Sequence, residues 1–250
     1  MKLFVVYVPC YNEEDGIEPM TNSFIVLEKK LIKSGIQLNV VWINDFSNDS
    51  TAEKINLACA NTLFFRSIHH SENRGLAGAL ETSLRDAGEQ SPETLYAVGL
   101  LDGDNSHPPE FFEPMLEKLN LGYDLIVASR FQNGSTVEGV PYHRQLMSLV
   151  MSYLFRLAGR VTNIRDYSCG FRVYRGSLFQ KISGYTFKKR SFACMVELLM
   201  VCDRQKAQCC EIPFTLRYDK KLSESKMRVW WTIRETLSVL FVCKSHHRPS

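Results

Sequence analysis

LYAVGLLDGDN, residues 95–105, joins a short apolar run to a pair of acids. The run at 95–101 has the length and composition of a buried strand, which ends where Asp102 begins a polar turn. Gly103 separates Asp102 from Asp104, so two carboxylates stand one residue apart with no side chain between them. Such a pair suits Mg²⁺ or Mn²⁺, which usually bind one or two protein carboxylates together with substrate phosphates. A solvated turn is the structural alternative for the same residues.

Strand and helix patterns alternate on both sides of this stretch, and no linker divides the chain. Such alternation is typical of βαβ units. It predicts a single α/β domain with a mostly parallel sheet and helices on both faces. The predicted strands lie at 3–8, 38–43, 95–101 and 125–128, and the predicted helices at 18–33, 47–60 and 76–87.

Polar clusters follow three of these strands. YNE at 11–13 follows the first, Asn44 and Asp45 follow the second, and the DGD turn at 102–104 follows the third. Parallel sheets bind ligands at the carboxyl ends of their strands. The three clusters are therefore expected to converge on one site.

The second half of the chain is less regular. Its patterns predict helices at 144–157 and 191–202, a polar and aromatic loop at 166–174, and a strand at 210–217. An aromatic-rich helical stretch at 229–243 carries a wide apolar face. That face is interpreted either as an interfacial helix that reaches a membrane-embedded lipid or as a helix packed on the domain or on a partner subunit.

The composition narrows the class of protein. The chain has 250 residues, 45% of them hydrophobic, and a net charge of +3, which excludes a disordered chain, a collagen-like repeat and a coiled coil. This mild and evenly spread charge argues against nucleic acid as a partner. The eight cysteines include no CxxC pair, and neither a signal peptide nor a transmembrane run is evident. These features predict reduced thiols and a cytoplasmic, non-secreted protein.

Eight collinear segments together resemble the family-2 glycosyltransferases of the GT-A fold. Within that family the chain is most similar to the branch of polyprenyl-phosphate hexosyltransferases that includes dolichol-phosphate mannose synthase. The segments are VPCYNEE (8–14), INDFSNDST (43–51), NRGLAGAL (73–80), LDGDNSHPPEFF (101–112), ASRF (128–131), DYSCGFRVY (166–174), the helix of Glu197, and ESKM (224–227).

The resemblance implies a Rossmann-like GT-A domain over residues 1–228. Its nucleotide-binding half would end near residue 105 and its acceptor half would cover about 106–228, followed by an amphipathic helix and tail at 229–250. The implied partners are a nucleotide-sugar donor, a divalent cation (Mg²⁺ or Mn²⁺) and a lipid-phosphate acceptor at a membrane surface. The resemblance therefore implies a peripheral protein at the cytoplasmic face of the membrane. It also implies a homo-oligomer or a membrane partner subunit as a further partner.

The resemblance also assigns roles to individual positions. Pro9, Tyr11 and Glu13 match residues that line the base and ribose, and Asp45 matches the carboxylate that accepts a hydrogen bond from the base. Asp102, Gly103 and Asp104 match the cation-binding turn. Arg130 and Arg172 match basic residues near the sugar phosphate and acceptor, and Ser225 with Lys226 match a basic loop over the diphosphate.

Two departures from the family pattern stand out. Family members commonly have DDGS where this chain has Asn44, Asp45, Phe46 and Ser47, so the first acid and the turn glycine are replaced. This replacement puts base selectivity in question. Ser106 also stands where the dolichol-phosphate enzymes often carry Gln, and a hydroxyl is a weaker metal ligand.

The identity of the acceptor decides whether a base is needed. A phosphate acceptor is already ionised at pH 7, whereas a hydroxyl acceptor must lose its proton to a carboxylate or histidine. Asp166 and Glu197 are the candidate bases, with His107 as a further candidate or as a loop residue before Pro108. Glu197, among apolar neighbours, must pair or have a raised pKa, and Arg172 must find a partner, for which Asp166 is one candidate. Cations for a phosphate acceptor are available at Arg144, Arg165, Arg172 and Lys226.

The function that the sequence favours is metal-dependent, inverting transfer of a hexosyl unit from GDP-mannose or a UDP-hexose to a polyprenyl phosphate. One alternative is a glycosyltransferase with a hydroxyl acceptor, such as a glycan or a secondary metabolite. Another is a catalytically silent subunit that binds nucleotide sugar. A sugar nucleotidyltransferase is disfavoured, since no Gly-rich, basic phosphate loop is found near the N-terminus.

Overall fold

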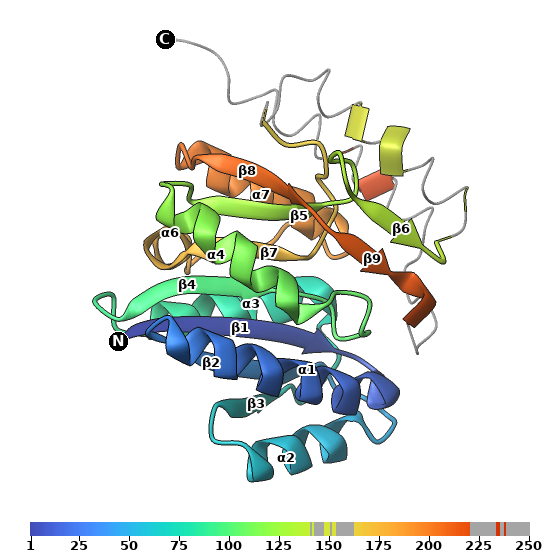
Figure 1. The fold of residues 1–250 in the computed structure, drawn as a ribbon. Helices are drawn as coiled ribbons and strands as arrows, with labels where there is room; N and C mark the ends of the chain where they lie inside the picture. Colours follow the sequence, from blue (N-terminus) through green and yellow to red (C-terminus); the bar gives the residue numbers. More distant parts are fainter. Residues whose placement is uncertain are drawn as a thin grey trace.

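A seven-stranded sheet forms the centre of the fold (Figure 1). The computed structural model describes residues 1–140, 142, 148–150, 152–153, 163–220, 234–235 and 238. The strands are ordered β3-β2-β1-β4-β7-β5-β8 and are parallel, except that β7 runs antiparallel to both of its neighbours. The predicted α/β fold with a mostly parallel sheet is therefore confirmed. The strands are β1 (Lys2–Cys10), β2 (Ile36–Asn44), β3 (Phe65–His69), β4 (Leu95–Leu100), β5 (Leu125–Ser129), β7 (Arg172–Arg175) and β8 (Cys209–Pro213).

Helices cover both faces of this sheet (Figure 1). A second, two-stranded sheet pairs β6 (Thr136–Glu138) with β9 (Thr215–Arg217) in parallel. Within the parts of the chain that the structure describes, every helix is too short or too polar to cross a bilayer. The helices are α1 (Glu14–Lys33), α2 (Thr51–Asn61), α3 (Gly75–Gly88), α4 (Phe112–Asn120), α6 (Gly176–Lys181) and α7 (Ala193–Arg204), with 3-10 turns η1 (Pro109–Phe111) and η2 (Tyr218–Lys220).

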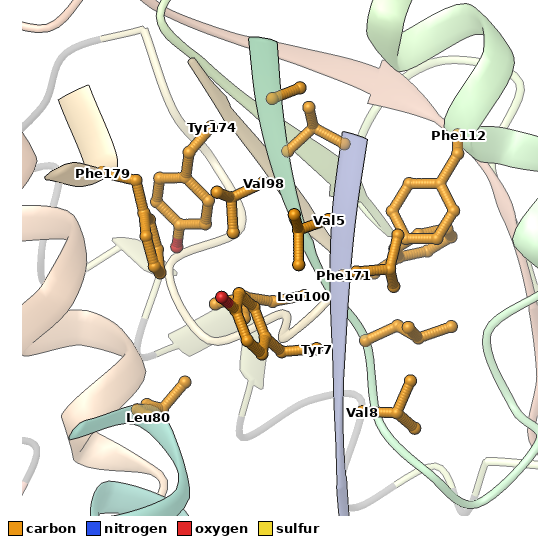
Figure 2. Packing of buried hydrophobic residues seen from close by; sticks show 14 of the residues in the cluster. Val5, Tyr7, Val8, Leu80, Val98, Leu100, Phe112, Phe171, Tyr174 and Phe179 are labelled. Carbon is orange, nitrogen blue, oxygen red and sulfur yellow. The ribbon is translucent and has the colours of Figure 1, made fainter. Parts of the chain in front are cut away.

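The central strand β1 contributes side chains to the core on both of its faces. Its residues 4–8 are fully buried, as an apolar strand with helices on either side must be. Phe4 points to one face and packs edge-on against Phe112 of α4, with ring centroids 5.1 Å apart. Tyr7 points to the other face and stacks on Phe179 of α6, at 6.5 Å. Figure 2 shows Phe112 on one side of the strand and Tyr7 with Phe179 on the other.

Three strands, β3, β6 and β7, were not anticipated, and the strand predicted at 210–217 was too long. β3 (FRSIH) is a short edge strand with three polar residues, so it lacks an apolar run. β7 (RVYR) was expected to be a loop because it carries an arginine at each end. In the structure Arg175 is paired, since its Nε lies 2.8 Å from Asp124 Oδ1. The strand predicted at 210–217 is two strands, because β8 joins the main sheet and β9 joins the small one.

Some predictions fall wholly or largely outside the described residues. These are the helices at 144–157 and 229–243, and the residues Arg144, Ser225 and Lys226. The seven cysteines within the described ranges are all free. Burial raises the pKa of the Cys209 thiol to about 12 and that of Cys210 to about 11, so both stay protonated near neutral pH.

The first prediction concerns the packing between β4 and α4. A Cβ added to Gly99 would lie 2.8 Å from a ring carbon of Phe112 and 3.0 Å from one of Phe4. We expect Gly99→Ala to lower the free energy of unfolding by about 1–3 kcal/mol, because two fully buried rings must shift. Urea denaturation measures the effect.

Gly184→Ala is the matched control for this substitution. A Cβ at Gly184 meets nothing within 4 Å, and its φ lies outside the left-handed region. The control should leave stability unchanged or raise it slightly. Equal effects of the two substitutions would contradict the packing described for Gly99.

Candidate active site at the carboxyl edge of the sheet

The carboxyl ends of β1, β2, β4 and β5 meet along one edge of the sheet. β7 is antiparallel to β4 and β5, so it begins at the same edge, and the loop that precedes it lies there too. The clusters expected to converge, at 11–13, 44–45 and 102–104, are thus at one edge. The loop at 166–171 and the end of β5 at residues 129–130 complete it.

Hydrogen bonds join the loops that follow β1 and β2. The Asp45 amide donates to the carbonyl of Cys10 at 2.8 Å. The Asn12 amide donates to Ser47 Oγ at 3.0 Å, and the Glu13 amide donates to Thr51 Oγ1 at 2.8 Å. Glu13 is buried, whereas Pro9 and Tyr11 are half-buried. The residues expected to line the base and ribose therefore form one rigid rim.

The DGD turn is packed so closely against β1 that only glycine fits at its centre. A Cβ at Gly103 would lie 2.7 Å from Cys10 Sγ and 2.8 Å from the Pro9 carbonyl oxygen. On the opposite side, a Cβ at Gly170 would lie 2.8 Å from Asp102 Oδ1, which brings the loop before β7 against this acid. Close packing on two sides fixes the two acids at the sheet edge.

The two acids differ in exposure. The Asp102 side chain is 29% exposed, whereas Asp104 is buried. Asp104 Oδ1 accepts hydrogen bonds from the Ser106 amide at 3.0 Å and from the Ser106 hydroxyl at 2.6 Å. Ser106, considered above as a weak metal ligand, therefore orients a carboxylate in this structure.

The donor set of the turn fits a hard divalent cation. Among the described residues, no group of three or more His, Cys, Asp or Glu side chains could hold a metal ion. Mg²⁺ and Mn²⁺ do not require such a group, because substrate phosphates and water can supply the remaining oxygens. Asp102 and Asp104 provide two carboxylates, and the missing Cβ of Gly103 lets the turn pack flat beside them.

His107 is held inside the loop that follows the turn. It is 4% exposed, and its Nδ1 accepts a hydrogen bond from the Asp102 amide at 3.2 Å. Its ring stacks on Phe171 with centroids 5.3 Å apart and meets Phe214 at 5.9 Å. This placement supports the loop role, because the Nδ1 that accepts the hydrogen bond from the amide is not available to take a proton from a substrate.

Asp45 is occupied by partners within the protein. Its Oδ1 accepts from the Arg74 amide at 2.8 Å and contacts His70 Nδ1 at 2.7 Å, while its Oδ2 accepts from the Gly75 amide at 2.8 Å. Both side chains of the Asp45–His70 pair are 5% exposed. The carboxylate thus anchors the start of α3 on the end of β2. Its expected contact with the base of a nucleotide remains a prediction.

Asn44 and Phe46, the two residues that depart from the DDGS pattern, both fit the loop after β2. Asn44 contacts His69 Nδ1 through its amide nitrogen at 3.2 Å and accepts from the Ser47 amide at 3.2 Å. Phe46, at the position of the usual glycine, keeps the left-handed backbone that glycine adopts freely, with φ 61°. Its side chain is 48% exposed.

Asp166, whose side chain is fully buried, forms a bidentate ion pair with Arg130, whose side chain is 21% exposed. Arg130 Nε donates to Asp166 Oδ2 at 2.7 Å and Nη2 donates to Oδ1 at 2.6 Å, while the Arg130 amide adds a third bond at 3.0 Å. Burial alone would raise the pKa of Asp166, but the Arg130 charge and these hydrogen bonds outweigh it and hold the pKa below its usual value. Asp102 is among the charges that raise the pKa of Arg130, which places this pair beside the DGD turn.

Glu211 of β8 supports this pair, and sequence reasoning missed it. Its Oε1 accepts from the amides of Arg165 and Asp166 at 2.8 and 2.7 Å, and its Oε2 accepts from Gln132 at 2.8 Å. A charged residue inside the predicted strand CCEIP was the available signal.

Arg172 lies in the core, with no exposed surface. Its guanidinium donates to the carbonyl oxygens of Cys169, Met195 and Tyr167 at 2.8, 2.8 and 2.7 Å. The pairing with Asp166 considered from the sequence is wrong, because Asp166 pairs with Arg130. The expected position of Arg172 near the sugar phosphate also needs correction, since its three donors connect β7, the preceding loop and α7. We infer that it positions this loop.

Glu197 has a similar role in the adjacent loop. Its Oε1 accepts from the Tyr185 hydroxyl at 2.6 Å and the Lys188 amide at 3.0 Å, and its Oε2 accepts from the Lys189 amide at 2.9 Å. Of the two outcomes expected for this acid, pairing is the one observed. Its partners are a hydroxyl and two amides, so it holds the loop between α6 and α7.

The second prediction concerns the Arg130–Asp166 pair. Asp166→Asn leaves the Arg130 charge without its counterion, and we expect a loss of about 3–5 kcal/mol in the free energy of unfolding. Because the pKa of Asp166 is lower in the folded state, its contribution is fully present above the unfolded pKa of about 4 and is lost as the pH falls through the folded pKa. Urea titrations from pH 7 downward should therefore show the gap between the two proteins narrowing in acid.

Glu113→Gln serves as the control for that experiment. It removes an ion pair to Lys30 in which the two side chains are 36% and 50% exposed. Exposed pairs contribute little to stability, so this variant should behave like the wild type. Equal losses in the two variants would contradict the burial of Asp166 in its pair with Arg130.

Known proteins resemble this chain over most of its length. Dolichol-phosphate mannosyltransferase of Pyrococcus furiosus is 27% identical over 229 residues, which are 91% of this chain and 60% of that protein. Polyprenol monophosphomannose synthase of Mycolicibacterium smegmatis is 25% identical over 224 residues, 89% of this chain and 80% of that one.

Solved structures share the fold at lower identity. Glucosyl-3-phosphoglycerate synthase from Mycobacterium tuberculosis, in complex with Mn²⁺ and uridine-diphosphate-glucose, has a TM-score of 0.65 at 15% identity, covering 100% of this chain and 80% of that chain. Residues 5–183, well over half of the chain, match the sequence profile described as Glycosyl transferase family 2. The chain therefore belongs to glycosyl transferase family 2.

Proposed function

We propose that the protein transfers a hexosyl unit from a nucleoside diphosphate sugar to a polyprenyl phosphate, with inversion at the anomeric carbon. One observation carries the choice of acceptor. The three side chains named from the sequence as candidate bases are each engaged as acceptors within the described part of the protein: Asp166 by Arg130, Glu197 by the loop between α6 and α7, and His107 by the Asp102 amide. An acceptor that arrives ionised needs none of them.

The pKa of Asp166 strengthens this choice. A general base works best when its pKa lies near the operating pH, whereas the Arg130 charge and the hydrogen bonds to Asp166 hold this pKa below that of an ordinary aspartate. A hydroxyl acceptor would therefore meet a weak base. A phosphate acceptor brings its own negative oxygen, which forms the new bond to the anomeric carbon as the bond to the nucleoside diphosphate breaks.

On the donor side, Asp102 and Asp104 would hold Mg²⁺ or Mn²⁺. Such an ion, when bound, supplies positive charge that stabilises the departing diphosphate. The glucosyl-3-phosphoglycerate synthase structure with Mn²⁺ and uridine-diphosphate-glucose supports a donor and cation of this class. The rim at 9–13 and the loop at 44–47 would take the nucleoside.

Arg130 is the described cation best placed for the acceptor phosphate or the sugar phosphate. Its side chain is 21% exposed, and it is held bidentately beside the DGD turn, so its direction is fixed while part of it faces solvent. Arg165, which directly precedes Asp166 in the loop before β7, is exposed. Names of relatives such as dolichol-phosphate mannosyltransferase support a lipid phosphate, which would bring the protein to a membrane surface.

The third prediction tests both halves of this proposal. The protein is incubated with Mn²⁺ and radiolabelled GDP-mannose, UDP-glucose or UDP-N-acetylglucosamine, and with either a short polyprenyl phosphate or the matching polyprenol. We expect label to enter the organic phase only with the phosphate, and only when the metal is present. Transfer to the polyprenol instead would favour the hydroxyl-acceptor alternative, and donor binding without any turnover would favour a silent subunit.

Asp104→Asn should lower transfer by 100-fold or more, on the order of the loss of one preorganised charge-stabilising group. Asp203→Asn is the matched control, because Asp203 is an exposed acid at the far end of α7. Near-normal activity of Asp104→Asn, with Asp203→Asn as reference, would remove the proposed metal role. Thermal unfolding of both variants checks that the fold is intact.

A further inference from the structure

Phe46, in the loop after β2, has an exposed aromatic ring and a left-handed backbone conformation that is unfavourable for a bulky residue. Three of the strands that end at the site are followed by a residue with positive φ: Asn12 at 52°, Phe46 at 61° and Asn105 at 63°. Asparagine tolerates this left-handed backbone, whereas a bulky residue rarely adopts it. In the described part of the chain, Phe46 is the only large apolar residue that combines positive φ with an exposed side chain.

The surrounding contacts hold Phe46 in this conformation. The preceding amide, of Asp45, donates to Cys10, and the following amide, of Ser47, donates to the Asn44 side chain at 3.2 Å. Ser47 Oγ in turn accepts from the Asn12 amide at 3.0 Å. Backbone strain that neighbouring contacts maintain in this way is concentrated at functional sites. These contacts fix the backbone on both sides of Phe46, and its side chain is 48% exposed.

Asp45 and Phe46 divide the work of this loop. Asp45 is 4% exposed, and the start of α3 uses both of its carboxylate oxygens. The apolar group that the loop offers to a ligand is the Phe46 ring. The apolar face of the ring suits a flat, partly apolar ligand. Aromatic side chains stack on every nucleobase, whatever hydrogen-bonding groups the base carries on its edge.

The sheet geometry gives the distance to the diphosphate site. β2 is separated from β4 by β1 alone, so the ends of β2 and β4 lie about 10 Å apart at the usual strand spacing. A ribose and a base can span that distance from a diphosphate held at Asp102 and Asp104. The other neighbours of β4 are β7 and then β5, where Arg130 and Asp166 lie, which leaves the β2 side for the nucleoside.

We propose that Phe46 is a specificity-determining residue that stacks on the nucleobase of the donor, an inference that rests on the proposed function. The ring would contact the face of the base, and other groups of the rim would form hydrogen bonds with the edge of the base. The chain should consequently bind purine and pyrimidine nucleoside diphosphates with a smaller difference in affinity than a site that reads the base edge alone.

The test measures binding of GDP, UDP and pyrophosphate by calorimetry in the presence of Mn²⁺. Pyrophosphate lacks the nucleoside, so the ratio of the two affinities isolates the contribution of the base. Phe46→Ala keeps the backbone conformation but removes the ring, and it should weaken nucleoside diphosphate binding about tenfold while pyrophosphate binding is unchanged. Phe46→Tyr restores a ring and should restore the affinity.

Leu63→Ala is the matched control, because Leu63 is a fully exposed apolar side chain in the turn before β3. It should bind all ligands like the wild type. Nucleoside diphosphate affinity that is unchanged in Phe46→Ala would overturn the stacking role and leave the proposed function standing. Wild-type protein that binds neither nucleoside diphosphate nor pyrophosphate would overturn both.

A spectroscopic variant gives an independent readout. Phe46→Trp places an indole at the same position, and stacking on a base should quench its emission when GDP or UDP is added but not when pyrophosphate is added. The wild-type response is subtracted, since the chain contains three other tryptophans. A purely structural role for Phe46 would instead lower the unfolding temperature of Phe46→Ala and leave the ratio of affinities unchanged.

Discussion

The candidate site depends on one reversal of direction in the sheet. β7 lies antiparallel between β4 and β5, so the chain enters it from the edge at which the parallel strands end. This brings the loop at 166–171 against Asp102 and Arg130, and the buried guanidinium of Arg172 holds the loop by three carbonyl oxygens. A parallel strand in the same place would send that loop to the opposite edge, far from the acids.

The acidic side chains near the site fall into two groups with different work. Asp45, Asp166, Glu197 and Glu211 accept hydrogen bonds from backbone amides, and each fixes a loop in place. Asp102 and Asp104 lie on the turn that packs flat on β1, where Asp102 retains more exposed surface than the buried acids. The four described acids of the first group are thus committed to holding loops, and the proposal of an acceptor that arrives ionised rests on this commitment.

Much of this arrangement could be predicted from the sequence, since local signals encode it. Apolar runs of ordinary length gave the positions of β1, β2, β4 and β5, and the polar residues at their ends gave the site edge. The role of Arg172 could not be predicted, because a buried arginine paired with carbonyl oxygens has the same sequence signal as one that binds phosphate. The Arg130–Asp166 pair joins residues 36 positions apart, and the strand that follows Asp166 was expected to be a loop. Only the three-dimensional structure could show that contact.

The position of β7 also constrains the order in which the chain can fold. β4 and β5 are closer to each other in sequence than either is to β7, yet β7 must separate them in the finished sheet. During synthesis the half that contains β1 to β4 emerges first and can pair locally, while β4 keeps an open edge until residue 175 has left the ribosome. An open edge of this kind is prone to wrong pairing, so the nascent chain is most vulnerable to aggregation in that interval.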